Sequence, residues 1–210
     1  DLVRVARIAL ANPTVREFNG MQSAVMPWGI GLIENTNPLL GEVPGVVGVK
    51  TGALSVVGYN FILAQEADAF GREIINISVT LARPNKAARA QSGRDMLAAM
   101  ATLPQQVPLI ADGEEVGMVR TWQGKSVSLR TAGGSSGVLL PGERAQRTLT
   151  LGTVGESPAG TVAGEWITTT PTGEQRVSVV TAAAIAEPDL WWRLTHPAIV
   201  FGWADPQAQE

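Results

Sequence analysis

The chain contains no cysteine and only one histidine, His196, among its 210 residues. The lack of cysteine excludes a disulfide framework, thiolate metal sites and a thiol nucleophile. A single histidine makes neither a metal site nor a catalytic triad by itself. Charged residues are scarce at 17%, and the net charge is only −3, so the positive field that binds nucleic acid phosphates is missing. We therefore expect no nucleic acid partner, no metal and no organic cofactor.

Long apolar runs are missing as well. No run approaches the roughly 18 residues that a membrane-spanning helix needs. Hydrophobic residues nevertheless make up 45% of the chain, which is enough for one large core or two small ones. The sequence begins with Asp1 inside an expected helix, without Met or a signal-like segment, so we expect a chain processed or cut from something longer.

The first hundred residues combine helical and strand patterns. The helical spacing of apolar residues near the start ends at Asn12-Pro13, because the residue before proline avoids the α region. Later β-branched runs predict strands of an antiparallel sheet. The expected elements, in chain order, are a helix over 2–11, an irregular connection over 21–44, strands over 46–52, 58–64 and 72–81, and a helix over 86–102.

The remainder of the chain has a different character. Short Val, Thr and Leu runs alternate with turn signals between residues 107 and 181, which is typical of a small all-β domain. The last stretch is rich in tryptophan although aromatic residues make up only 5% of the chain. We therefore predict an α/β (α+β) domain over 1–102, a β-rich domain over 103–186 and an aromatic helix or tail over 187–210.

The sequence Lys-Thr-Gly at residues 50–52 is the leading candidate for a functional site. Three common residues can match by chance, but this triplet closes a β-branched run, and Gly-Tyr-Asn at 58–60 opens the next expected strand. In serine peptidases that bind penicillin, a Lys-Thr-Gly strand forms one edge of the active site. It lies beside a Ser-x-x-Lys nucleophile motif and a Ser-x-Asn motif.

Three segments occur in collinear order: Asn-Thr-Asn-Pro-Leu-Leu at 35–40, Gly-Val-Val-Gly-Val-Lys-Thr-Gly at 45–52 and Gly-Tyr-Asn at 58–60. Together they resemble the low-molecular-mass, penicillin-binding serine D-alanyl-D-alanine carboxypeptidases. The resemblance continues, more weakly, through the rest of the chain. It implies the C-terminal portion of a transpeptidase/β-lactamase-like domain, with flanking helices on its sheet, followed by a smaller all-β domain.

The resemblance also implies roles for the residues around the triplet. Lys50 would supply positive charge near the active-site serines, and the Thr51 hydroxyl would donate to the terminal carboxylate of the substrate. Gly52 would leave room for the backbone of an extended peptide, which can add to a strand edge. The backbone N–H of Ala53 would complete the oxyanion hole. Arg89 matches an arginine that helps to hold the carboxylate, a role that Lys86 or Arg83 could fill instead.

The nucleophile motif of this family is missing from the sequence. The residues three positions before the three lysines are Val47, Arg83 and Trp122, so no Ser-x-x-Lys occurs, and no asparagine completes a Ser-x-Asn motif. An activated serine needs a base within about 3 Å. We therefore expect this chain alone to be inactive.

Two other segments have competing interpretations. Residues 133–137 match Gly-x-Ser-x-Gly, but a strand follows where a nucleophile elbow needs a helix, so we predict a hairpin loop. The tail containing Trp191, Trp192 and Trp203 fits either a helix lying in the membrane interface or a helix docked on the β domain or on a neighbouring subunit. We interpret His196 as an interfacial residue of this tail.

The resemblance implies an extracytoplasmic enzyme of the cell envelope. It would trim stem peptides ending in D-Ala-D-Ala through an acyl-serine intermediate, and β-lactams would inhibit it. The serine would come from upstream sequence or from a second chain. A sheet without its partner helices exposes a large apolar face, so we predict a partner chain or a dimer that covers it. The alternative is a non-catalytic peptidoglycan-binding or scaffold protein that retains the Lys-Thr-Gly strand.

Overall fold

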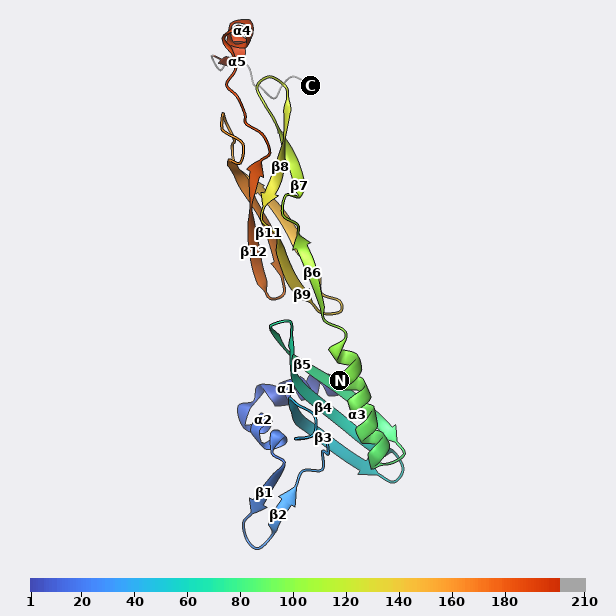
Figure 1. The fold of residues 1–210 in the computed structure, drawn as a ribbon. Helices are drawn as coiled ribbons and strands as arrows, with labels where there is room; N and C mark the ends of the chain where they lie inside the picture. The colour runs from blue at the N-terminus through green and yellow to red at the C-terminus, as the bar shows by residue number, and fades with distance from the viewer. Residues whose placement is uncertain (201–210) are drawn as a thin grey trace. The chain divides into compact units, whose positions relative to one another are not determined.

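The computed structural model describes residues 1–200 and divides the chain into two compact units, Asp1–Gln105 and Gln106–Glu210 (Figure 1). Each unit contains a buried apolar cluster of its own. The predicted fold class, an antiparallel sheet with flanking helices followed by a β-rich part, is confirmed.

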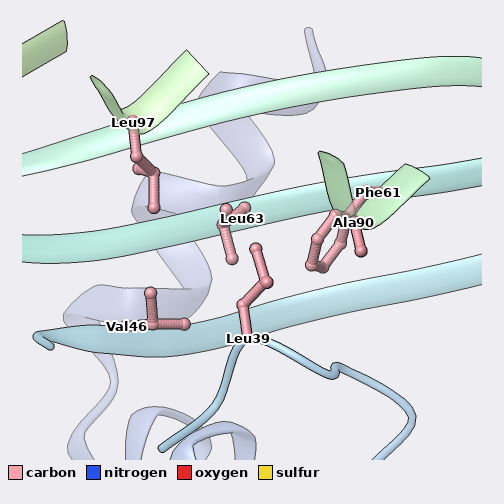
Figure 2. Close-up of a cluster of buried hydrophobic side chains, with 6 residues drawn as sticks. All are labelled: Leu39, Val46, Phe61, Leu63, Ala90 and Leu97. Atoms are coloured by element: carbon pink, nitrogen blue, oxygen red, sulfur yellow. The ribbon is translucent and has the colours of Figure 1, made fainter. Parts of the chain in front are cut away.

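A three-stranded antiparallel sheet in the order β3-β4-β5 forms the centre of the first unit. Helix α3 covers one face of the sheet, whereas α1 and α2 lie on the other (Figures 1 and 2). All four elements begin where predicted; the strands end two to five residues later than predicted, and α3 ends one residue earlier. The bounds are α1 Leu2–Ala11, α2 Pro13–Gly20, β3 Val46–Leu54, β4 Gly58–Ala69, β5 Arg72–Arg83 and α3 Lys86–Ala101.

The core of the first unit lies between the sheet and α3 (Figure 2). Phe61 and Leu63 alternate along β4, so both side chains point from the same face of the sheet. Leu39 enters the same cluster from the loop before β3 and is fully buried. Gly93 of α3 lets the helix approach closely, because a Cβ there would lie 2.9 Å from a methyl of Leu39. The remaining members of the cluster are Val46, Ala90 and Leu97.

A β-hairpin replaces part of the irregular connection predicted over 21–44, so that prediction was wrong for these residues. Strands β1 (Ser23–Met26) and β2 (Gly31–Glu34) pair antiparallel. Each strand has only four residues, and the intervening turn places Trp28 and Gly29 at positive φ, 59° and 76°. Pro27 and Gly29 lie in this turn, and both residue types are common in turns.

Helix α2 was not expected from the sequence, although its start has a clear signal. The Asn12 side chain accepts a hydrogen bond from the Val15 N–H at 3.2 Å, and Pro13 occupies the first helical turn. Asparagine caps helices and proline is favoured at the first position. Asn12-Pro13 therefore ends α1, as predicted, and also begins a second helix.

The second unit contains two sheets, of which the larger is antiparallel. One has five strands in the order β10-β11-β12-β8-β7, and the other pairs β6 with β9. Its buried cluster centres on Leu129, Ala163 and Val179. The bounds are β6 Gln105–Ile110, β7 Glu115–Arg120, β8 Ser126–Ala132, β9 Ser135–Leu139, β10 Gln146–Leu151, β11 Val162–Thr170 and β12 Gly173–Thr181.

The Gly-x-Ser-x-Gly segment at 133–137 is neither a nucleophile elbow nor a hairpin loop. Ser135 begins β9, so the segment connects two strands and no helix follows. These strands belong to different sheets, because β8 pairs with β12 and β7 whereas β9 pairs with β6. The predicted hairpin was therefore wrong: sequence signals mark a turn but do not show which strands pair across it.

Two short helices end the described part of the second unit, α4 (Leu190–Thr195) and α5 (Pro197–Val200). The Asp189 side chain caps α4 by accepting from the Trp192 N–H at 2.7 Å. Within residues 1–200, every helix is too short or too polar to cross a membrane. Trp203, which was assigned to the aromatic tail, lies outside the described residues.

Candidate active site

The Lys-Thr-Gly triplet lies on β3, which is an edge strand because, within residues 1–200, it pairs only with β4. Thr51 stands opposite Phe61 in the register and therefore faces α3, whereas Lys50 stands opposite Ile62 and faces the other side. Lys50 and Gly52 are exposed, and Thr51 is partly buried. The three residues thus present an ammonium, a hydroxyl and an open stretch of backbone along one sheet edge.

The Thr51 hydroxyl makes a side-chain contact that the sequence did not predict. Its Oγ1 forms a hydrogen bond with Oγ1 of Thr36, in which either atom could be the donor. The Thr36 carbonyl in turn accepts from Nη2 of Arg89 at 3.1 Å. Thr36 therefore links Thr51 to Arg89, although Thr36 and Arg89 are 53 residues apart in the sequence.

Arg89 extends from α3 toward this edge and is only 4% exposed. Its guanidinium lies over the Phe61 ring, 5.3 Å from the centroid. Burial lowers the pKa of Arg89, and the nearby Tyr59 opposes this shift, but an arginine remains protonated in proteins. Its Nε is buried without a hydrogen-bond partner. The alternatives named from the sequence, Lys86 and Arg83, are both exposed.

The segment before β3 holds Thr36 in place through two asparagines. The Asn35 side chain donates to the Met21 carbonyl at 2.9 Å and accepts from the Asn37 N–H at 3.0 Å. The Asn37 side chain accepts from the Leu39 N–H at 3.0 Å. These local turns anchor the segment to the core through Leu39. The Asn-Thr-Asn-Pro-Leu-Leu motif is therefore a scaffold that presents one hydroxyl to β3.

The Gly-Tyr-Asn motif has a structural role beside the triplet. Asn60 accepts from the Ala82 N–H at 2.9 Å and donates to the Gly58 carbonyl at 3.2 Å. The register of β4 and β5 shifts at this point, and Ala82 has φ 58°. The asparagine satisfies a backbone donor that the irregular ladder would leave unpaired. Ala53, the predicted oxyanion donor, is exposed at the same end of the sheet, opposite Tyr59.

Comparisons with known proteins give matches only among solved structures, because no family model and no curated protein matches. Penicillin-binding protein 5 from Haemophilus influenzae is 17% identical, over 86% of this chain and 54% of its own, with a TM-score of 0.45. D-alanyl-D-alanine carboxypeptidase DacD from Francisella tularensis is 18% identical over 75% and 40%, with a TM-score of 0.37. Penicillin-binding protein D2 from Listeria monocytogenes, in an ampicillin-bound form, is 27% identical over 44% and 36%, with a TM-score of 0.39.

The chain thus resembles penicillin-binding proteins and D-alanyl-D-alanine carboxypeptidases among the solved structures. It spans between 36% and 54% of the length of these three proteins. All three TM-scores are below 0.5.

A separate cleft of about 340 Å³ lies in the second unit. Trp122 and Trp192 line it with their rings 6.4 Å apart in a T-shaped arrangement. Glu156 and Glu187 share a hydrogen bond that raises the pKa of Glu156, and slight burial and the charge of Glu187 add to the shift. The charge of Arg193 opposes this rise in pKa, and Nη2 of Arg193 forms an ion pair with Oε2 of Glu187 at 2.7 Å. Within residues 1–200, no group of three or more His, Cys, Asp or Glu side chains could hold a metal ion.

The aromatic and apolar side chains of α4 lie in two different environments. Trp192 contacts Trp122 and stacks on His196 at 4.4 Å, so this tryptophan faces its own unit. Trp191 is 75% exposed, and its apolar neighbours Leu190 and Leu194 are exposed to a similar degree. Peripheral membrane contact stays a prediction, and within α4 it would involve Trp191 and these leucines.

Proposed function

We propose that residues 1–105 form one wall of the active site of a serine D-alanyl-D-alanine carboxypeptidase, which removes the terminal D-alanine of peptidoglycan stem peptides. The observation that carries this proposal is the Thr51 hydroxyl on an edge strand, linked through Thr36 to the buried cation of Arg89. A hydroxyl donor beside the exposed ammonium of Lys50 suits a substrate that ends in a free carboxylate. The edge of β3 can pair with an extended peptide.

The proposed reaction passes through an acyl-serine. A serine hydroxyl attacks the carbonyl carbon of the scissile amide, the C–N bond breaks, and D-alanine leaves with the proton on its nitrogen; water then hydrolyses the ester. We assign stabilisation of the oxyanion to the Ala53 N–H and electrostatic support to Lys50. The sequence contains no Ser-x-x-Lys, so the serine and its base would come from a further polypeptide segment, where β-lactams would also react.

Exposed apolar side chains on the first unit support such a partner. Ile8 on α1 is 70% exposed, Phe18 on α2 is 63% exposed, and Trp28 at the tip of the hairpin is 91% exposed. Exposed apolar side chains that gather into a patch mark sites of association. We propose that the polypeptide carrying the nucleophile covers these side chains, and that the assembled enzyme acts in the cell envelope, outside the cytoplasm.

Labelling with a fluorescent penicillin tests this function. The protein is isolated under native conditions, incubated with the reagent and analysed by mass spectrometry for a covalent adduct. We expect the adduct on a co-purifying polypeptide, or on an upstream segment, that bears Ser-x-x-Lys. An adduct on residues 1–210 themselves would overturn the assignment of the nucleophile. No adduct and no partner would instead favour a non-catalytic peptidoglycan-binding or scaffold protein.

A further inference from the structure

Thr36 touches both side chains that the proposed function places near the substrate carboxylate, and it does so through different atoms. Its hydroxyl meets the Thr51 hydroxyl, and its carbonyl accepts the Arg89 guanidinium. The flanking asparagines bond elsewhere, because the Asn35 side chain donates to the Met21 carbonyl and the Asn37 side chain accepts from the Leu39 N–H. Thr36 is thus the link between β3 and α3 at this edge.

We propose that Thr36 is a positioning residue, which holds the Thr51 hydroxyl in the orientation that binds the carboxylate of the substrate. A hydroxyl has one proton to donate and lone pairs to accept with. When Thr36 donates to Oγ1 of Thr51, the proton of Thr51 is left free to point toward a ligand at the open edge. This inference rests on the proposed carboxypeptidase function and deepens it.

Arg89 acts indirectly in this arrangement. A guanidinium that is 4% exposed and packed over Phe61 cannot form a solvent-accessible bidentate pair without moving. It instead holds the Thr36 backbone at 3.1 Å while its charge stays near the edge of β3. The orientation of Thr51 therefore depends on a buried cation through one intermediate residue.

The first experiment uses the chain as it is and measures the rotamer of Thr51 by NMR. Three-bond couplings from Cγ2 of Thr51 to the backbone nitrogen and carbonyl carbon report χ1. We expect a single staggered rotamer in the wild type and in Thr36→Ser, and averaged couplings or another rotamer in Thr36→Val. The matched control is Thr172→Val, which removes another threonine pair, with Thr170 in the second unit, and should leave Thr51 unchanged. Identical couplings in Thr36→Val would overturn the inference.

The second experiment uses the protein assembled with the polypeptide that carries the nucleophile. Penicillin G and its methyl ester differ in the carboxylate that Thr51 would bind. We expect Thr36→Val to slow acylation by the free acid about tenfold, as small misplacements of binding groups do, and to leave the ester unaffected. Thr36→Ser should keep the wild-type difference. If Thr36→Val slows acylation equally with both reagents, Thr36 has a merely structural role and the inference is overturned.

The two experiments separate this inference from the function on which it rests. If neither reagent acylates the wild-type assembly, the proposed function is contradicted, whereas the Thr51 couplings still decide whether Thr36 orients that hydroxyl. If acylation occurs and Thr36→Val behaves as the wild type in both experiments, the function stands and the role of Thr36 is refuted.

Discussion

Thr51 is the residue on which the proposed chemistry most directly depends. Replacing it with valine keeps the shape and removes the hydroxyl donor. A hydrogen bond to a charged group contributes about 1.5–3 kcal/mol, so we expect kcat/KM of the assembled enzyme for a peptide ending in D-Ala-D-Ala to fall about 10- to 100-fold in Thr51→Val. Thr51→Ser, which retains the hydroxyl, should remain close to the wild type. Unchanged kinetics in the valine variant would remove Thr51 from the site.

Glu156 gives a prediction that is independent of the proposed function. Its hydrogen bond with Glu187 raises the pKa of its carboxyl, and Arg193 lowers it. A carbon-detected NMR titration should therefore place the Glu156 midpoint above the ordinary value of a glutamate. Glu187→Gln should lower this midpoint, because an amide can donate to the ionised carboxylate, and Arg193→Gln should raise it further.

The sign of the effect on stability follows from that direction. The folded state holds the Glu156 proton more tightly than the unfolded state, so the contribution to stability is present below the unfolded pKa and is lost as the pH rises through the folded pKa. Shifts of the Glu156 midpoint in the same direction in both variants would contradict the assigned causes.

At the scale of elements, α3 begins at a side-chain cap. Asn85 accepts from the Ala88 N–H at 2.8 Å and so satisfies a backbone donor of the first turn. We expect Asn85→Ala to destabilise the first unit by about 1 kcal/mol, measured by denaturant unfolding. Asn85→Asp keeps an acceptor oxygen and should retain most of this stability. Equal losses in both variants would show that the cap oxygen is not the cause.

The same helix shows how one element can serve two purposes. Its face toward the sheet carries small residues, Ala90 and Gly93, which bring the helix close to Phe61 and Leu63. That close approach places the guanidinium of Arg89 over the Phe61 ring and within reach of Thr36. The packing of α3 and the position of the buried cation are therefore set together.

At the scale of the whole molecule, each unit has its own buried cluster, with Leu39 in the first and Leu129 in the second. Both leucines are fully buried, and replacing such a residue by alanine costs about 2–5 kcal/mol. We expect Leu39→Ala to speed amide hydrogen exchange in β4 and leave β11 unchanged, and Leu129→Ala to do the reverse. If either variant accelerates exchange in both units alike, the two cores are coupled.

The sequence by itself determined the elements whose signals are local. The β-branched runs around residues 46–52 and 72–81 predicted strands, and Lys50, Thr51 and Gly52 were found because they are contiguous. The hairpin over residues 23–34 escaped prediction because its strands are only four residues long. Ser135 was misassigned because pairing partners depend on contacts far along the chain.

Only the tertiary structure decided how the candidate site is connected. Thr36 lies 15 residues from Thr51 and 53 from Arg89, so no periodicity or spacing could reveal that it contacts both. Burial of Arg89 is likewise a property of packing, since an arginine on a helix is exposed by default. Local propensities act over a few residues, whereas these contacts arise from the way α3, β3 and the segment before β3 pack around one core.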